Sequence, residues 1–171
     1  EPLEGSAAKA QKVYNRGRWP GFYITKGGYG GIARKTYLEN VGGRLPTNLW
    51  MYEETGHTDE AKKELISLFG GRSPFDTPKP TRLLDFVLKV AGTSETLMLD
   101  SFAGSGTTAH AVLNANKADN GNRHFILIEM MDYADSITAE RVKRVIRGYG
   151  EGKPAVEGTG GNFSFYDLGK P

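Results

Sequence analysis

Apolar and polar residues alternate with two different periods along the second half of the chain. Apolar positions three or four residues apart predict helices over 81–91, 107–118 and 135–147, and an earlier helix that Thr58 caps and Gly70 ends. Short apolar runs predict strands over 96–99 and 124–130, and the alternating Phe163 and Phe165 predict a third. Helices and strands in this order are typical of a parallel sheet with right-handed crossovers. We therefore expect an α/β fold with about three parallel strands and flanking helices.

The helix expected over 135–147 is basic and amphipathic. Its apolar positions, which we expect to face inward, are Ile137, Val142, Val145 and Ile146. Its basic positions, which we expect to face outward, are Arg141, Lys143, Arg144 and Arg147. We interpret this charged face as solvated surface rather than as a binding site.

The first part of the chain has a weaker pattern. Residues 1–48 contain many glycines and turn formers, with strand-like runs only at 21–25 and 31–37. We expect an extended, partly irregular arm here. The predicted domain division is therefore 1–57 for the arm and 58–171 for the α/β unit.

Charge is distributed unevenly over the 171 residues, although the formal net charge is only +2. Residues 1–48 hold eight Lys or Arg and three Asp or Glu, a net of +5, and residues 49–171 hold fourteen against seventeen, a net of −3. Aromatic residues lie between the basic ones of the arm: Lys12, Tyr14, Arg16, Arg18, Trp19, Phe22, Tyr23 and Lys26. This composition fits contact with a phosphate backbone, and it fits a solvated surface equally well.

The composition also excludes several classes of chemistry. The chain has no cysteine, which excludes disulfides, zinc–thiolate sites and thiol catalysis and suits a cytoplasmic protein. No apolar run approaches the length of a membrane span, and residues 1–17 have no signal-peptide core. The three histidines, His57, His110 and His124, lack metal-ligand spacing. We expect a cytoplasmic protein without a membrane partner, and no metal site.

The sequence DSFAGSG joins the strand at 96–99 to the helix at 107–118. Glycine lets a ligand approach the backbone closely, and a strand, a glycine turn and a helix N-terminus together form a nucleotide-binding crevice. Gly104, Gly106 and Ala109 fit the alanine-ended dinucleotide pattern, although the same glycines would also serve a tight strand-to-helix turn. Glu129 ends the next strand, where an acid contacts ribose hydroxyls in such folds. A plain surface acid is the alternative interpretation of Glu129.

Asp100 indicates which of the possible ligands the crevice would bind. It precedes the glycines, where a dinucleotide places its pyrophosphate, and a carboxylate repels a pyrophosphate. S-adenosylmethionine has no phosphate and carries a sulfonium and an α-ammonium, which an acid attracts. A P-loop is excluded because no Gly-Lys-Ser/Thr follows the glycines, and a nucleophile elbow is excluded because residue 103 is Ala.

Several stretches together resemble a known family. DSFAGSGTTAHAV resembles the S-adenosylmethionine-binding motif of amino-methylating DNA methyltransferases of the β arrangement, particularly the modification subunits of type III restriction–modification systems. FDTPKPTRLLDFVL resembles the Thr-x-Lys-Pro motif that precedes it in that arrangement, and NLWMYEETGHTDEAKKELISLFGG and GGNFSFYDLG resemble the flanking stretches. The resemblance covers residues 20–170 and depends on the order of the motifs. It implies a partial Rossmann-like methyltransferase fold, the cofactor-binding half.

The resemblance also implies roles for particular residues. Those that would line the methionine half of S-adenosylmethionine are Asp100, Phe102, Ala103, Gly104 and Gly106. Thr77 and Lys79 would hold its carboxylate end. Glu129 would contact its ribose hydroxyls, and Met130 would lie beside its adenine. It assigns no role to His57 or Trp50.

One departure from the family pattern limits what we expect of this chain. The family's catalytic signature is an Asp/Asn/Ser-Pro-Pro-aromatic tetrapeptide, and no Pro-Pro occurs in this sequence. Because that tetrapeptide lies upstream in the β arrangement, the chain looks like the C-terminal part of a longer enzyme. Residues 1–57 would then hold the end of the target-recognition region, and 58–171 the S-adenosylmethionine-binding half. We expect no catalytic residue here and no activity of the isolated chain.

The resemblance to type III subunits implies adenine-N6 methylation of DNA, with a restriction subunit and a second modification subunit as partners of the full-length protein. The residues themselves do not distinguish adenine-N6 from cytosine-N4 methylation. A non-catalytic S-adenosylmethionine-binding module and, disfavoured by Asp100, an NAD-dependent dehydrogenase are the other interpretations. The DNA sequence recognised and the oligomeric state cannot be inferred.

Overall fold

A computed structural model of the chain describes Asn15, Gly42 and residues 22–26, 29–34, 45–150 and 155–169. The chain divides into two compact units, Glu1–Leu45 and Pro46–Pro171. The division lies upstream of residue 57, because helix α2 (Tyr52–Thr55) packs on a helix of the second unit. Five of the basic and aromatic residues expected to contact phosphate, Lys12, Tyr14, Arg16, Arg18 and Trp19, lie outside the described residues.

The described core of the first unit is a small hairpin. Strands β1 (Phe22–Ile24) and β2 (Ile32–Arg34) pair antiparallel, with Tyr23 opposite Ala33. The two strand-like runs of the arm are therefore confirmed as strands.

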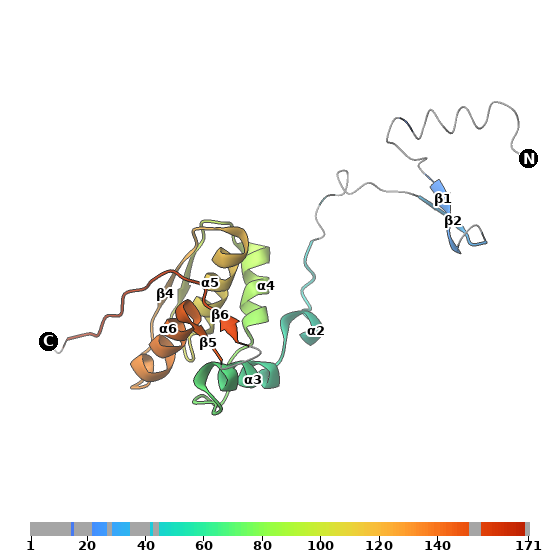
Figure 1. Ribbon diagram of the computed structural model, residues 1–171. Coiled ribbons are helices and arrows are strands. Elements are labelled where there is room, and N and C mark those ends of the chain that lie inside the picture. Colours follow the sequence, from blue (N-terminus) through green and yellow to red (C-terminus); the bar gives the residue numbers. More distant parts are fainter. Residues whose placement is uncertain are drawn as a thin grey trace, which may run out of the picture. The chain divides into compact units, whose positions relative to one another are not determined.

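The second unit alternates helices with short strands (Figure 1). Its further elements are α3 (Thr58–Phe69), α4 (Thr81–Ala91), β3 (Leu97–Asp100), α5 (Thr107–Asp119), β4 (His124–Leu127), the π-helix η3 (Ala134–Ala139), α6 (Glu140–Arg147), β5 (Gly148–Tyr149) and β6 (Val156–Glu157). Strands β3 and β4 pair in parallel, with Leu97 opposite His124 and Asp100 opposite Leu127. The expected helices and the parallel pair are confirmed.

Helices cover one face of the parallel pair. α4 and α5 pack side by side (Figure 1), and the buried Leu88 and Val112 meet Met98 and Phe125 from the strands. A second cluster joins α3, α5 and α6 through Leu68, Ala109, Leu113, Val142 and Val145. Burial of these apolar side chains holds the helices on the sheet.

The opposite face of the parallel pair is largely exposed within the part of the chain that the structure describes. Because side chains alternate along a strand, Leu97, Leu99, Ile126 and Ile128 point away from the helices, and they are 48–62% exposed. Parallel sheets normally have both faces covered. We refer to this apolar surface, on which no described element packs closely, as the bare face.

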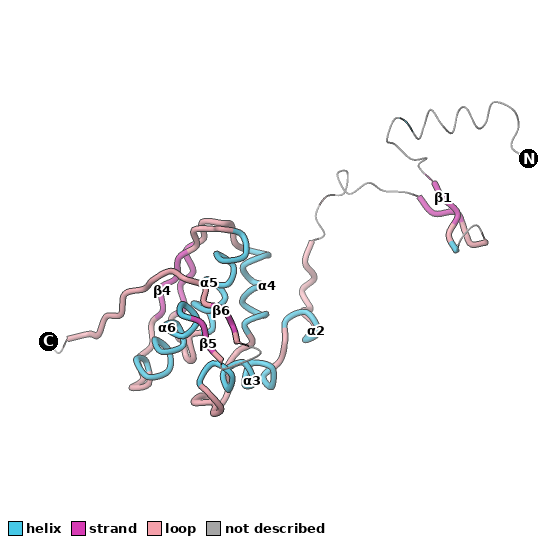
Figure 2. The backbone as a smooth tube through the Cα atoms, viewed as in Figure 1, coloured by secondary structure: helices cyan, strands magenta, loops and turns pink. Residues whose placement is uncertain are grey.

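Three sequence-based expectations differ from the structure. No third parallel strand forms among the described residues: residues 158–169 are irregular (Figure 2), Phe163 packs on the second cluster, and Phe165 is exposed. Phe163 therefore reflects contact with a cluster and not a strand ladder. The cap of α3 is His57, whose Nδ1 accepts a hydrogen bond from the Glu60 amide at 3.1 Å, and Thr58 is the first helical residue. The segment over 135–147 begins as the π-helix η3 and only then becomes α6.

Candidate functional site

A cavity of about 600 Å³ lies where β3 and β4 end. Three segments form its walls: residues 75–84, the glycine loop 100–108, and residues 129–133. The predicted site residues that line the cavity are Thr77, Lys79, Asp100, Phe102, Ala103, Gly104, Glu129 and Met130. Gly106, the ninth, does not line it. Parallel strands place their carboxyl ends at one sheet edge, which explains why residues far apart in sequence meet here.

Asp100 is held in a fixed position on the cavity wall. Its Oδ1 accepts a hydrogen bond from the Phe102 amide at 3.2 Å, and its Oδ2 accepts one from the Thr108 hydroxyl at 2.6 Å. A carboxylate has about four acceptor positions, so Asp100 can still accept from a ligand. It brings a negative charge to the cavity in a defined orientation.

Glu129 braces the glycine loop. Its Oε2 accepts from the Gly104 amide at 2.8 Å and its Oε1 accepts from the Met131 amide at 3.1 Å. Partial desolvation, and then the charge of Glu129, raises the pKa of Tyr133. Glu129 therefore organises the cavity before any ligand is present.

Gly104 and Gly106 are required at their positions for different structural reasons. Both have a positive φ, +53° at Gly104 and +77° at Gly106. A Cβ on Gly104 would lie 3.4 Å from the Phe75 ring at the cavity, whereas a Cβ on Gly106 would lie 3.0 Å from the Thr138 carbonyl oxygen in η3. Gly106 therefore serves the packing of the loop on η3, and its contact with a cofactor stays a prediction.

Two aromatic residues that the sequence analysis missed lie in the cavity wall. Phe75 and Tyr133 meet edge to face, with ring centroids 5.5 Å apart. Phe75 precedes Thr77 by only two positions, so the motif itself was a signal for it. Nothing local marks Tyr133, which η3 carries into place. Together they add an apolar surface suited to a flat ring system.

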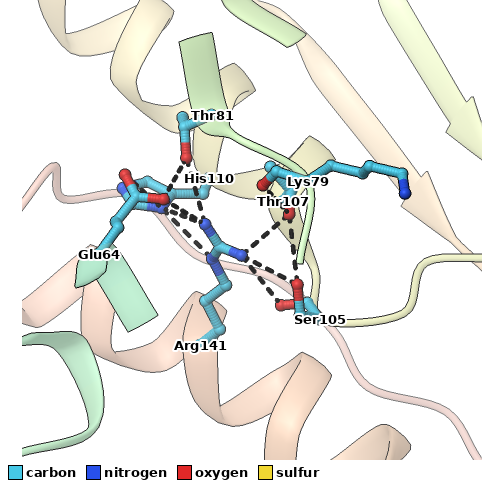
Figure 3. Close-up of polar contacts among 7 residues, drawn as sticks. All are labelled: Glu64, Lys79, Thr81, Ser105, Thr107, His110 and Arg141. Carbon is cyan, nitrogen blue, oxygen red and sulfur yellow. Dashed lines mark hydrogen bonds and ion pairs between the residues drawn. The ribbon is translucent and has the colours of Figure 1, made fainter. Parts of the chain in front are cut away.

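Arg141 lies directly behind the glycine loop, and its expected outward orientation is wrong. Its relative exposure is 0%, and its guanidinium contacts five side chains from four segments (Figure 3). These partners are Glu64, Thr81, Ser105, Thr107 and His110. Burial lowers the pKa of Arg141 and the carboxylate of Glu64 opposes this shift. The group stays charged because arginine deprotonates only far above neutral pH.

His110 is the neutral member of this cluster. It is 2% exposed, and its Nδ1 accepts from Arg141 Nη2 at 3.1 Å and from Nε at 3.3 Å. Burial, and then the charge of Arg141, lowers its pKa to about 3. Its 3.8 Å approach to Glu64 is therefore not an ion pair at neutral pH.

The chemistry of the cavity is anionic on one wall and basic on another. Asp100 and Glu129 contribute carboxylates from the strand ends, and Lys79 contributes an amine from the loop before α4. Within the described ranges, no three His, Asp or Glu side chains gather as a metal site. None of the helices in the described part of the chain combines the length and apolar character that crossing a bilayer requires. A glycine loop at the carboxyl ends of parallel strands is the arrangement at which α/β folds of the Rossmann-like class bind nucleotide-like ligands, and it makes this cavity the candidate binding site.

Comparison with known proteins identifies the family. The chain matches the sequence profile of the DNA methylase family of N6 and N4 methyltransferases over residues 5–140, and it belongs to that family. It is 37% identical over 157 residues to the Mod subunit of the type III restriction–modification enzyme StyLTI of Salmonella typhimurium, covering 83% of this chain and 24% of that protein. The resemblance to type III modification methyltransferases is confirmed.

Two further relatives show the same relation. The Mod subunit of the type III enzyme EcoPI of Escherichia phage P1 is 42% identical over 91 residues, which is 51% of this chain and 14% of that subunit. The type II methyltransferase M.KpnI of Klebsiella pneumoniae is 40% identical over 81 residues, 47% of this chain and 19% of that enzyme. The chain thus spans a quarter or less of the length of these three relatives.

Proposed function

We propose that this chain is the S-adenosylmethionine-binding segment of a site-specific DNA methyltransferase that methylates adenine N6 in a type III restriction–modification system. The observation that carries the proposal is the cavity, which gathers Asp100, Glu129 and Lys79 from three separate segments. In the full-length enzyme, DNA is the substrate, and a restriction subunit and a second modification subunit are the partners. The enzyme acts in the cytoplasm.

The donor groups of the cavity fit S-adenosylmethionine. A fixed carboxylate at Asp100 suits the sulfonium and the α-ammonium, because opposite charges attract strongly in a partly desolvated site. Lys79 and Thr77 suit the carboxylate end, and Glu129 keeps acceptor capacity for the ribose hydroxyls. Met130, Phe75 and Tyr133 supply apolar contact for the adenine. When bound, the cofactor supplies the methyl group, and these residues position it.

The bare face supports the partial fold. Four aliphatic side chains on a two-stranded parallel sheet leave a surface that such sheets normally cover. We propose that further elements of the longer enzyme, which contain the methyl-transfer signature, cover this face and extend the sheet. This accounts for both the missing Pro-Pro tetrapeptide and the exposed apolar residues.

Isothermal titration calorimetry tests the cofactor. The chain should bind S-adenosylmethionine and S-adenosylhomocysteine and should not bind NAD. Asp100→Asn should weaken binding about tenfold or more, because a charged hydrogen bond contributes about 1.5–3 kcal/mol. Asp119→Asn is the matched control: Asp119 pairs with Arg123 at 2.7 Å, does not line the cavity, and should leave the affinity unchanged. Binding of NAD without a response to S-adenosylmethionine would overturn the proposal.

Two alternatives remain tied to observations. The absence of Pro-Pro favours a non-catalytic S-adenosylmethionine-binding module, and the matched family includes N4 as well as N6 methyltransferases, which leaves cytosine N4 as a substrate. Tritium transfer from labelled cofactor to unmethylated duplex DNA, measured with the full-length enzyme and followed by identification of the labelled base, separates these alternatives. We expect no transfer by the isolated chain. Transfer by the chain alone would show that a complete base-binding site exists here. A methyl group on cytosine after reaction with the full-length enzyme would show that the target base is cytosine and not adenine.

A further inference from the structure

The buried guanidinium behind the cavity touches both of the walls that a ligand would lie between. We infer that Arg141 is a positioning residue: it holds the glycine loop and the Thr77–Lys79 loop in a fixed relation to each other. The inference rests on the proposed function only for the identity of the ligand, because the contacts themselves are present without one.

The first set of contacts fixes the glycine loop. Arg141 Nη1 donates to the Ser105 hydroxyl at 3.1 Å and to the Thr107 hydroxyl at 2.9 Å (Figure 3). Both residues line the cavity and both are at least 95% buried. The same loop is also held by Thr138, three residues before Arg141 on the same helical segment, whose hydroxyl donates to the Gly104 carbonyl at 2.6 Å. The loop therefore cannot move outward without breaking buried hydrogen bonds.

The second set of contacts reaches the opposite wall. The Thr107 hydroxyl, which accepts from Arg141, donates to the Lys79 carbonyl at 3.2 Å. Arg141 Nη2 donates to the hydroxyl of Thr81, the first residue of α4 after this loop, at 3.2 Å. Figure 3 shows the Lys79 side chain extending away from the cluster, so its backbone is the anchored part.

The remaining contacts fix the guanidinium itself. Nη2 pairs with Glu64 Oε2 of α3 at 2.8 Å, and Nε donates to His110 Nδ1 of α5 at 3.3 Å. Arginine presents five donors in a rigid planar fork, whereas lysine carries one ammonium on a flexible stem. A lysine at 141 would keep the ion pair with Glu64 and lose simultaneous contact with both loops. This difference makes the role of Arg141 separable from charge pairing.

Hydrogen–deuterium exchange on the ligand-free chain tests the inference directly. Arg141→Lys should speed exchange about tenfold in peptides covering 102–108 and 76–84, with little change in the strands, since a lost charged hydrogen bond opens the contact locally. Arg144→Lys is the matched control, because Arg144 lies on the same helix, pairs with Glu140 at 2.7 Å and contacts neither loop. It should leave both peptides unchanged.

A second pair of variants, at Thr107, tests the same contact in case Arg141→Lys does not fold. Thr107→Val removes the hydroxyl between Arg141 and Lys79 without unpairing a charge, and should speed exchange in 76–84, whereas Thr107→Ser keeps a hydroxyl there and should keep the protection. Uniformly faster exchange throughout the chain with Arg141→Lys, or an unchanged 76–84 peptide with Thr107→Val, would overturn the inference.

Titration with S-adenosylhomocysteine completes the test. Arg141→Lys should weaken binding about tenfold, because the apparent affinity falls with the fraction of molecules in the competent arrangement. If the wild-type chain binds no S-adenosylhomocysteine while Arg141→Lys still loosens both loops, the proposed function fails and the positioning role stands. If the wild type binds and Arg141→Lys binds equally well, the positioning role fails and the proposed function stands.

Discussion

His110 should make the stability of this protein depend on pH in a predictable direction. The groups facing its ring are Arg141 from α6, Glu64 from α3 and Tyr149 from β5. Burial and the charge of Arg141 lower its pKa from the ordinary 6.5 to about 3. The unfolded chain therefore takes up a proton near pH 6.5 that the folded chain refuses until about pH 3. This stability contribution is complete above the unfolded pKa and is lost as the pH falls toward the folded pKa.

The size of the effect follows from the two pKa values. A separation from 6.5 to about 3 corresponds to about 5 kcal/mol over the whole interval. From about pH 7 to about pH 5 the loss is about 2 kcal/mol, because the unfolded histidine is then almost fully protonated and the folded one is still neutral. That interval lies above the ordinary pKa range of carboxyl groups.

Urea denaturation followed by far-UV circular dichroism measures this loss at constant ionic strength. His110→Asn is the comparison, since its amide oxygen can accept from Arg141 but does not titrate. The wild type should lose about 2 kcal/mol more than His110→Asn between about pH 7 and about pH 5. Parallel pH profiles for the two proteins would show that His110 has the same pKa in the folded and unfolded states, and would refute the neutral, accepting ring.

Two further expectations concern packing. Gly106→Ala should destabilise the fold by about 1–2 kcal/mol more than Gly160→Ala, as measured by urea denaturation. Both glycines have φ near +75°, so the backbone strain of the two variants is similar, but only at position 106 does the new Cβ meet Thr138. Equal losses would mean that η3 yields to the methyl group. Leu99→Gln on the bare face should reduce self-association in sedimentation velocity with little loss of stability, whereas Leu168→Gln, exposed in the irregular C-terminal segment, should change neither. Unchanged association with Leu99→Gln would show that copies do not meet through the bare face.

Much of the second unit could be predicted because its signals are local. Apolar spacing predicts α4 over the residues that form it, and the run before Asp100 predicts β3. Once two strands are known to be parallel, their carboxyl ends must lie together, and so Asp100 and Glu129 had to approach one cavity. The strand expected at Phe163 and Phe165 failed because alternation also arises when one ring packs on a cluster.

The place of Arg141 could not be predicted from its residue type. Its spacing from Thr138 and Val145, three and four residues, puts it on the buried stripe of the segment. A basic side chain normally faces water, because burying an unpaired charge is costly. What reverses this preference is Glu64, which lies 77 positions earlier and meets Arg141 only in the folded chain. No local pattern contains that partner.

The same pairing explains why a buried cation behind the glycine loop is compatible with a cationic ligand in front of it. An unpaired guanidinium there would repel a sulfonium, because charges interact strongly where water is scarce. Arg141 is neutralised by Glu64 at 2.8 Å, and His110 beside it adds no charge at neutral pH. The hydroxyls of Ser105 and Thr107, which lie between Arg141 and the cavity, are dipoles and carry no net charge. The field at this wall of the cavity is therefore left to Asp100 and Glu129, whose charges attract a cation and repel a pyrophosphate.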